Sequence, residues 1–370
     1  MRIYFALLIF FTHLDFAFAD HQLYKSDEEV IAIHNYRMVG IRKEFDNLVI
    51  KSLHPVQKIE RETQPNLVIR KLIKNSDLLS VIYFDGNEIK INEYSSEKMQ
   101  KDELIYSMSI AKSFVSYLLG NAICDGLVSS LDDPIDNYVQ ETRGTLYNGT
   151  SLRNIINMSA GDAIHFDNNS LKTYAMSVVV KKVPIATLLE QLKNKPKSNQ
   201  SDWIIGFANF FYSNILTDLI AKAIDEVTPD GFAKYFQQKI SDPAGFSQDV
   251  VFLKDANDWI IGFAFLYASR SDYVNFGKLI ARNWKSDSCV GQYLRDIYEH
   301  KVPTNKMGND YKSYAGFFWT DKPKFDFKHL SMHGHGGQRI IINLETGEVL
   351  ATHSIRRNFD TSLIEEIMSK

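Results

Sequence analysis

The chain has 370 residues, of which 45% are hydrophobic and 24% charged, a composition typical of a globular protein with a substantial core and room for two structural lobes. Its formal net charge is −3 at pH 7 and it contains no long basic run, so we expect no nucleic-acid partner. Its two cysteines are too few for a metal site built on cysteine alone.

The first residues predict export. One positive charge, Arg2, precedes an apolar run to Thr12 that is too short to span a bilayer, and Ala17-Phe-Ala19 has the small-x-small form of a signal-peptidase site. We therefore expect a signal peptide over residues 1–19 and an exported protein, periplasmic or secreted. His13 and Asp15 weaken the apolar region, and an uncleaved membrane anchor is the alternative.

Export would permit a disulfide between the two cysteines, Cys124 and Cys289. Nothing in the sequence places their Cα atoms within the roughly 7 Å that a bridge requires. Because Cys124 falls on a predicted core helix, we expect it to behave as a small buried hydrophobic residue. A disulfide is the alternative.

A hairpin is the first clear element along the chain. Residues 20–63 predict helix and irregular structure, with no recognisable chemistry. Leu79–Phe84 and Asn87–Tyr94 are strand-like, and Asp85-Gly86 between them suits the mirror-image turns whose twist matches paired strands.

A buried helix follows the hairpin. Apolar residues recur at the three-and-four spacing of a core helix at Phe114, Val115, Leu118, Leu119, Ala122 and Ile123. Asp125-Gly126 ends the pattern. Ser109 and Lys112 lie three residues apart where this helix begins, so they share one face of its first turn. A hydroxyl and an amine are therefore expected at the tip of a core helix.

The middle of the chain is helical, and strands return near its end. The candidate helices or helix-flanking turns are Leu127–Tyr138, Leu152–Met158, Pro184–Leu192, Ile215–Glu226, Gly231–Ile240 and Arg270–Trp284. Later come the strand-like Tyr314–Thr320, the glycine-rich His333–Gly337, the strand-like Arg339–Asn343, a turn at Glu345–Gly347, the strand-like Glu348–His353 and a terminal helix, Thr361–Met368.

This order of elements predicts an α+β fold. One antiparallel sheet would be built from N- and C-terminal strands and flanked by helices in an α/β sandwich, with a helical lobe inserted. We expect one domain over residues 20–370, with the sheet lobe at about 64–105 and 310–370 and the helical lobe at about 106–309.

Three ordered motifs carry chemistry. Ser109-x-x-Lys112 is weak alone, since Ser95-Ser-Glu-Lys98 repeats it in a polar stretch that we expect to be a solvated loop. Tyr212-Ser-Asn214 precedes a predicted helix and also has a decoy, Tyr273-Val-Asn275, in which Tyr273 is expected to pack. His333-Gly-His-Gly-Gly-Gln338 precedes a strand, and its glycines allow a substrate to approach the backbone closely.

Together and in this order, the three motifs resemble those of the serine β-lactamase and penicillin-binding-protein superfamily, in its class C-like branch. This branch also includes esterases, D-amino-acid peptidases and aminohexanoate-oligomer hydrolases. Further segments similar to it are Leu131–Ile135, Gly144–Tyr147, Ser151–Gly161, Asp272–Gly277 and Tyr314–Trp319. The resemblance runs from about Leu79 to about His353, and Gly334–Gln338 is most similar to the aminohexanoate-hydrolase-like members. It implies a β-lactamase/transpeptidase-like fold and catalysis through an acyl-enzyme.

Physical chemistry gives each motif residue a role beside the resemblance. A serine hydroxyl is a poor nucleophile until a base takes its proton, so Ser109 is the candidate nucleophile and Lys112 its candidate base. Burial and the positive end of the helix dipole would lower the pKa of Lys112. Tyr212 is the candidate second proton carrier, since a phenol beside an ammonium ionises more readily and can then protonate the leaving group. The alternatives are a plain helix-terminal Ser109, a surface Lys112 and a core Tyr212.

Asn214 offers an amide donor and an acceptor to a substrate carbonyl or amide, and a turn or capping role is its alternative. Two backbone amides would hold the developing oxyanion, that of Ser109 and one from the glycine-rich strand.

The register of the glycine-rich strand decides the second amide. If Met332-His333-Gly334 occupies the family triplet, His335 supplies the amide, and His333, Gly334 and Gly336 border the substrate. In the other register, His335-Gly336-Gly337 is the triplet and Gln338 supplies it. A metal site on the paired histidines would need a third ligand and none is adjacent, so we expect no metal and no organic cofactor.

The edge strand departs from the β-lactamase pattern. It contains no Lys-Thr-Gly, the triplet whose lysine helps hold the carboxylate of penicillins, and the class A deacylating glutamate motif has no evident counterpart. We therefore expect a serine hydrolase that cleaves an ester or amide bond of a small-molecule or short peptide-like substrate. The alternatives are a β-lactamase or D,D-peptidase proper, and a non-catalytic protein that binds cell-wall peptide in the same cleft.

Overall fold

The computed structural model describes residues 35–53, 63–162, 174–197, 213–304, 311–357 and 359–368. The predicted signal peptide, residues 1–19, and the candidate proton carrier Tyr212 lie outside the described residues. Across the described ranges, every helix is too short or too polar to cross a bilayer.

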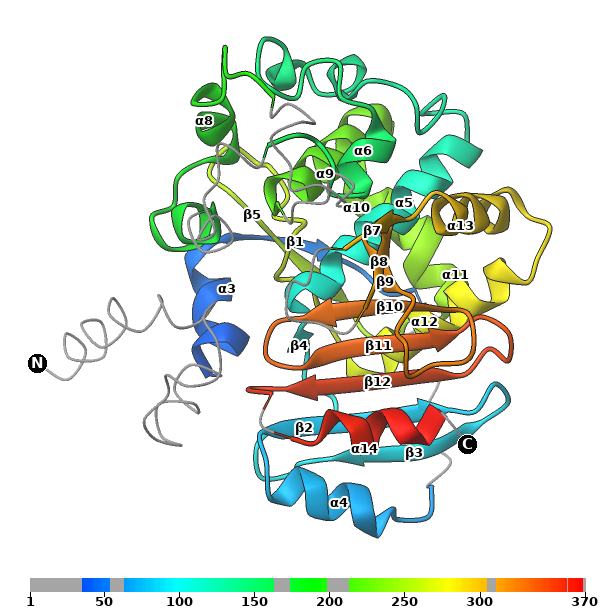
Figure 1. Ribbon diagram of the computed structural model, residues 1–370. Coiled ribbons are helices and arrows are strands. Elements are labelled where there is room, and N and C mark those ends of the chain that lie inside the picture. Colours follow the sequence, from blue (N-terminus) through cyan, green and yellow to red (C-terminus); the bar gives the residue numbers. More distant parts are fainter. Residues whose placement is uncertain are drawn as a thin grey trace, which may run out of the picture.

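Strands from both ends of the described chain form one eight-stranded antiparallel sheet (Figure 1). The order across it is β3-β2-β12-β11-β10-β9-β8-β7. The bounds are β2 Leu78–Phe84, β3 Ile89–Tyr94, β7 Val302–Pro303, β8 Ser313–Ala315, β9 Phe318–Thr320, β10 His329–Gly334, β11 Gln338–Asn343 and β12 Val349–Ser354. β12 pairs with β2, with Leu350 opposite Tyr83, which joins the two ends of the chain. This arrangement confirms the predicted antiparallel sheet, although β7 begins before the expected boundary at 310.

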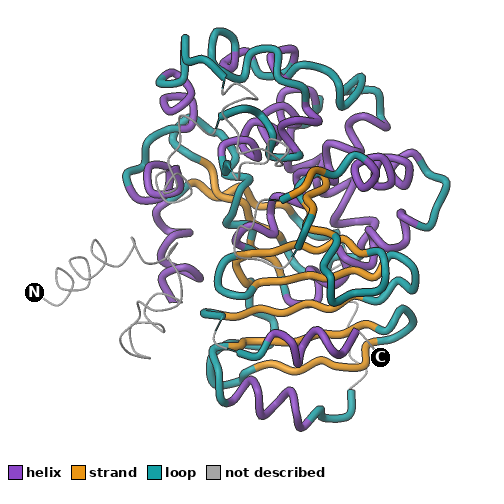
Figure 2. The backbone as a smooth tube through the Cα atoms, in the orientation of Figure 1, coloured by secondary structure: helices purple, strands orange, loops and turns teal. Residues whose placement is uncertain are grey.

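Helices cover both faces of this sheet (Figure 2). The α-helices are α3 Ile41–Glu44, α4 Leu67–Lys74, α5 Ala111–Cys124, α6 Leu152–Ile156, α8 Ile185–Glu190, α9 Ile215–Val227, α10 Gly231–Phe236, α11 Asp242–Ala244, α12 Arg270–Trp284, α13 Cys289–Glu299 and α14 Thr361–Glu365. Short π-helical segments are η1 Tyr36–Gly40, η6 Met176–Val180 and η8 Gln237–Ser241, and 3₁₀ turns are η2 Met108–Ile110, η3 Ile135–Asn137, η4 Gln140–Thr142 and η9 Glu366–Met368.

Alternation along β11 divides the core into two layers. Ile340 and Ile342 face the large core that contains α5 and α12, whereas Ile341 faces a smaller cluster beneath α4 and α14. Figure 1 shows α14 lying across the outer face of the sheet. The outer and inner faces of the sheet are therefore distinct, and only the inner one faces α5.

A second antiparallel sheet is absent from the sequence prediction, which assigns residues 20–63 to helix and irregular structure and residues 106–309 to a helical lobe. Its order is β1-β5-β6-β4, with bounds β1 Asp46–Ile50, β5 Val250–Lys254, β6 Tyr267–Ala268 and β4 Ile105–Tyr106. Two of these strands have only two residues, and β1 pairs with β5 about two hundred positions later, so local periodicity carries no signal for them.

The predicted hairpin is confirmed, with a longer connection. The loop between β2 and β3 has four residues, 85 to 88. Within it, the Asp85 carboxylate accepts hydrogen bonds from the backbone N–H groups of Asn87 at 2.9 Å and Glu88 at 2.8 Å. The decoy after β3 is not a solvated loop: Ser95 is buried, and the Lys98 amine donates to the carbonyl oxygen of Ser76.

α5 is buried on all sides and joined to α13 by a disulfide. Its residues from Ala111 to Ala122 are buried, as expected for a helix that is apolar all round. Cys124 at its end is bonded to Cys289 at the start of α13, with a Cα–Cα distance of 5.7 Å. The expectation that Cys124 is an unpaired hydrophobic residue is therefore wrong. α13 comes this close because Gly120 leaves room for the Tyr293 ring, which a Cβ would meet at 2.4 Å.

We expect the disulfide to contribute about 3–5 kcal/mol to the free energy of unfolding, because it closes a long loop in the unfolded chain. It joins residues 165 positions apart. Urea unfolding of the wild type with and without reductant, beside the double variant Cys124→Ala/Cys289→Ala, measures this contribution. Reductant should lower the wild-type midpoint and leave the variant unchanged. Equal wild-type midpoints in the two conditions would contradict the prediction.

Candidate active site

The turn that carries Ser109 is held by Leu266, the residue that precedes β6. The backbone N–H of Ser107 donates to the carbonyl oxygen of Leu266 at 2.7 Å, and the N–H of Leu266 donates to Ser107 Oγ at 3.2 Å. Met108 follows with a φ of +47°, a conformation that costs a non-glycine residue about 1–3 kcal/mol and is concentrated at functional sites. Ser109 comes next, half-buried, in the 3₁₀ turn η2 rather than in the first turn of α5.

Tyr273 fixes the same region from the opposite side. Its ring is fully buried, and its hydroxyl lies 2.7 Å from the carbonyl oxygen of Ile105 and 3.1 Å from that of Leu266. The tyrosine of the decoy motif therefore packs, as predicted, and ties α12 to the strand that leads into Ser109.

Lys112, the second residue of α5, is 1% exposed, so it is not a surface lysine. Its Nζ donates to Ser109 Oγ at 2.9 Å and to the carbonyl oxygen of Phe263 at 2.8 Å. The structure thus brings the predicted hydroxyl and amine into direct contact and adds a third atom, the Phe263 oxygen, that fixes the amine.

Burial lowers the pKa of Lys112 from 10.5 to about 7, and the charge of Asp218 opposes this shift. At neutral pH a substantial fraction of Lys112 is therefore an uncharged amine that can accept a proton.

Asp218 is a site-proximal residue that the sequence motifs do not indicate. It lies on α9, fully buried, and its carboxylate accepts hydrogen bonds from the backbone N–H groups of Gly262 at 2.7 Å and Phe263 at 3.1 Å. The Tyr174 hydroxyl donates to it at 2.7 Å. Burial raises the pKa of Asp218 to about 7, against the effect of these donors and of Lys112. The available sequence signal is an acidic residue in the first turn of the Ile215–Val227 helix, among apolar neighbours.

Asn214 stands at the N-cap position of α9 without capping it. Its side chain makes no capping hydrogen bond, the residue is 6% exposed, and no donor in the described ranges reaches Oδ1. The capping alternative is therefore not supported, and a buried amide oxygen is left to accept a bond from another group.

The end of β10 packs against the turn that carries Ser109. A Cβ on Gly334 would lie 2.5 Å from the carbonyl oxygen of Ser107 and 2.9 Å from the Cβ of Met108, so only glycine permits this approach. Met332 and Gly334 face the same way because side chains alternate along a strand. This geometry favours Met332-His333-Gly334 as the triplet. Gly336, in the turn after β10, has a φ of +85°.

The His333 ring lies on the outer face of the sheet, away from Ser109. It meets the Tyr311 ring edge to face, with centroids 4.5 Å apart, and burial together with nearby cations lowers its pKa. Arg339, its cross-strand partner, binds Glu365 of α14 at 2.8 Å on that outer face. Only the backbone of His333 can therefore border the Ser109 site.

The described part of the chain contains no group of three or more His, Cys, Asp or Glu side chains suited to a metal ion.

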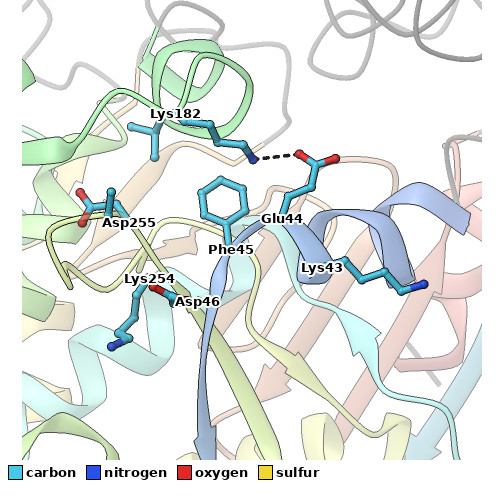
Figure 3. A pocket seen from close by; sticks show the side chains of 9 residues that line it. Lys43, Glu44, Phe45, Asp46, Lys182, Lys254 and Asp255 are labelled. Carbon is cyan, nitrogen blue, oxygen red and sulfur yellow. Dashed lines mark ion pairs between the residues drawn. The ribbon is translucent and has the colours of Figure 1, made fainter. Parts of the chain in front are cut away.

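A separate surface pocket of about 270 Å³ involves none of these residues (Figure 3). Two of its lysines form ion pairs: Lys182 binds Glu44 at 3.0 Å, and Lys254 pairs with Asp258, which is not among the residues that line the pocket. Asp255 accepts backbone N–H groups, including that of Ile185 at 2.7 Å. The pocket therefore has structural contacts rather than a cluster of reactive groups.

Solved structures with the same fold include proteins that are described as hydrolases. A protein described as a 6-aminohexanoate-dimer hydrolase from Bacillus anthracis superposes with a TM-score of 0.69 at 14% identity, covering 91% of this chain and 92% of its own. A D-amino acid amidase from Ochrobactrum anthropi SV3 gives 0.63 at 14% identity, covering 82% and 100%. A class C beta-lactamase from Rhodobacter sphaeroides gives 0.58 at 15%, covering 81% and 95%. At these identities the likeness shows the fold.

Among curated protein sequences, none matches this chain. The sequence model of the Beta-lactamase family matches residues 73–258, half of the chain, and this range contains Ser109, Lys112 and Asn214. The family match and the shared architecture agree with the predicted resemblance, and the chain belongs to the beta-lactamase family of serine hydrolases.

Proposed function

We propose that this protein is a serine hydrolase that cleaves an ester or amide bond through an acyl-enzyme on Ser109. One observation carries the proposal: a buried amine with a pKa of about 7 lies 2.9 Å from the hydroxyl of a half-buried serine. A lysine that served only structure would have no need of a serine hydroxyl as its partner in a desolvated position.

The proposed reaction assigns each proton transfer to a residue, with Tyr212 assigned from the sequence alone. The uncharged Lys112 amine takes the proton of Ser109 as Oγ attacks the substrate carbonyl carbon. The oxyanion accepts hydrogen bonds from the backbone N–H groups of Ser109 and His335. The intermediate collapses, the bond to the leaving group breaks, and Tyr212 supplies a proton to that group and takes one from the Lys112 ammonium. Water then attacks the acyl-enzyme and gives a proton to the uncharged Lys112 amine, which returns it to Ser109 Oγ as the ester bond breaks and the acid is released.

The substrate side of the site favours a small, uncharged acyl group. Asn214 offers its buried amide to the substrate, and the backbone of residues 333–336 forms the facing edge. Met332 stands where β-lactamases of this superfamily carry a lysine, so this strand offers no cation to a substrate carboxylate. The relatives described as an aminohexanoate-dimer hydrolase and a D-amino acid amidase support an amide as one substrate class.

The disulfide supports export as part of the proposal. Structural disulfides persist in the periplasm and outside the cell and are rare in reducing compartments. The bond between Cys124 and Cys289 therefore agrees with the signal-peptide pattern of residues 1–19. We propose that the protein works in the periplasm or is secreted, or is membrane-anchored if the signal is not cleaved.

A fluorophosphonate probe should form one covalent adduct on the wild-type protein, measured by intact mass, and none on Ser109→Ala. The reason is that the Lys112 amine lies beside the Ser109 hydroxyl and can activate it. Ser95→Ala is the matched control, since it removes the serine of the decoy motif, and its adduct should equal that of the wild type. An unlabelled wild type, or a labelled Ser109→Ala, would refute the proposed nucleophile.

The labelling rate should rise with pH through about 7 and then level off, because only the uncharged form of Lys112 accepts the proton. Below this pH the rate should fall about tenfold per pH unit. A stopped-flow or quenched time course from pH 5 to 9 gives the profile. A midpoint near pH 10, about the ordinary pKa of a lysine, would show that burial does not lower the pKa of the Lys112 amine.

Esters and short amides without a carboxylate beside the scissile bond should be turned over faster than a chromogenic cephalosporin, by about tenfold or more in kcat/KM, because Met332 cannot pair with a carboxylate. p-Nitrophenyl esters and short p-nitroanilides assayed beside the cephalosporin make the comparison. Met332→Lys tests the cause and should raise the relative rate on the cephalosporin. Faster cephalosporin hydrolysis by the wild type would favour the β-lactamase alternative.

A further inference from the structure

We propose that Asp218 is a positioning residue for Lys112: it fixes the Gly262–Phe263 backbone whose carbonyl oxygen holds the lysine amine. The inference rests on the proposed role of Lys112 as the base. It adds a residue from α9 that neither the sequence motifs nor the family resemblance brings to the site.

Hydrogen bonds connect Asp218 to Ser109 in three steps. The carboxylate accepts the backbone N–H groups of Gly262 and Phe263 at 2.7 and 3.1 Å. The carbonyl oxygen of Phe263 accepts the Lys112 amine at 2.8 Å, and that amine reaches Ser109 Oγ at 2.9 Å. Because two adjacent N–H groups bind one carboxylate oxygen, the peptide between them cannot rotate without losing a buried bond. The peptide that immediately precedes the Phe263 carbonyl group is thereby held in place, beside the group that binds the Lys112 amine.

The loop that contains Phe263 needs such an anchor. It connects β5 to the two-residue strand β6, and within it Phe265 has a φ of +59°. Leu266, at its end, already holds the Ser107 backbone on the other side of the nucleophile. Asp218 therefore fixes the start of a segment whose end positions the Ser109 turn.

The charge of Asp218 acts on the same amine. A carboxylate near an ammonium favours its charged form, so Asp218 raises the pKa of Lys112 against the larger effect of burial. The titratable groups acting on Asp218 in the described ranges are Lys112 on α5 and Tyr174 ahead of η6, and Tyr174 in turn lies near Tyr147 and Asp255. Two substitutions of Asp218 separate its hydrogen bonds from its charge. Asparagine removes the charge but keeps an oxygen that accepts the backbone N–H groups, whereas alanine removes both.

The experiment is the pH profile of fluorophosphonate labelling at Ser109 for the wild type, Asp218→Asn and Asp218→Ala. Asp218→Asn should move the midpoint down by about 1 pH unit, since it removes the attraction for the ammonium. Asp218→Ala should also lower the plateau rate at high pH by about 10- to 100-fold, because the Phe263 carbonyl group is no longer held. Asparagine should restore most of that plateau.

Asp272→Asn is the matched control. Asp272 is likewise a fully buried aspartate that accepts a backbone N–H, that of Ser247 at 2.8 Å, and burial raises its pKa, but it lies on α12. Asp272→Asn should reduce thermal stability and leave the midpoint of the labelling profile unchanged.

Midpoints and plateaus of the Asp218 variants equal to those of the wild type would overturn the inference while the proposed function stands. If Asp218→Ala does not fold, as judged by circular dichroism, the Asp218→Asn midpoint decides alone. An unlabelled wild type would instead refute the proposed function.

Discussion

The burial of one amine organises the centre of this molecule. A pKa that falls from 10.5 to about 7 means that the protein favours the uncharged form of Lys112 by about 5 kcal/mol relative to water. Such a shift requires the exclusion of water along the whole start of α5, which explains why this helix is buried on all sides. It also requires polar partners for the amine, and the Phe263 carbonyl and Ser109 hydroxyl provide them. The fold therefore supplies both the desolvation and the two oxygen atoms.

Several elements distant in sequence meet to hold this arrangement. The loop between β5 and β6 supplies Phe263 to the lysine and Leu266 to the Ser107 backbone, so one segment fixes both members of the Ser109 and Lys112 pair. The hydroxyl of Tyr273 ties α12 to that segment. Gly334 then lets β10 close on the same turn from the large sheet. The unfavourable φ of Met108 persists because contacts on three sides determine it.

Long periodic elements could be predicted from sequence, whereas contacts between distant segments could not. The apolar spacing in α5 and α12 and the alternation in β2 and β3 are local, and they gave the central helix and the large sheet. The four-stranded sheet was missed because its strands are short and pair across the chain. The disulfide was missed because spacing in sequence says nothing about distance. Ser109 and Lys112 were found from their residue types, but the Phe263 carbonyl was not, since a backbone atom leaves no sequence signal.

The placement of charge around the large sheet bears on the substrate. Cations are present near β10 and β11, but Arg339 and Lys322 both bind Glu365 on the outer face, which α14 covers. On the inner face, Met332 occupies the first position of the proposed triplet, and its side chain is neutral and fully buried. A carboxylate bound beside Ser109 would therefore lose its hydration without meeting a cation from this strand, at a cost of several kcal/mol. The same strand imposes no such penalty on an uncharged ester or amide, whose carbonyl oxygen needs only backbone N–H donors. If the protein has the proposed activity, the neutral residue on this strand therefore favours a substrate without charge near the scissile bond.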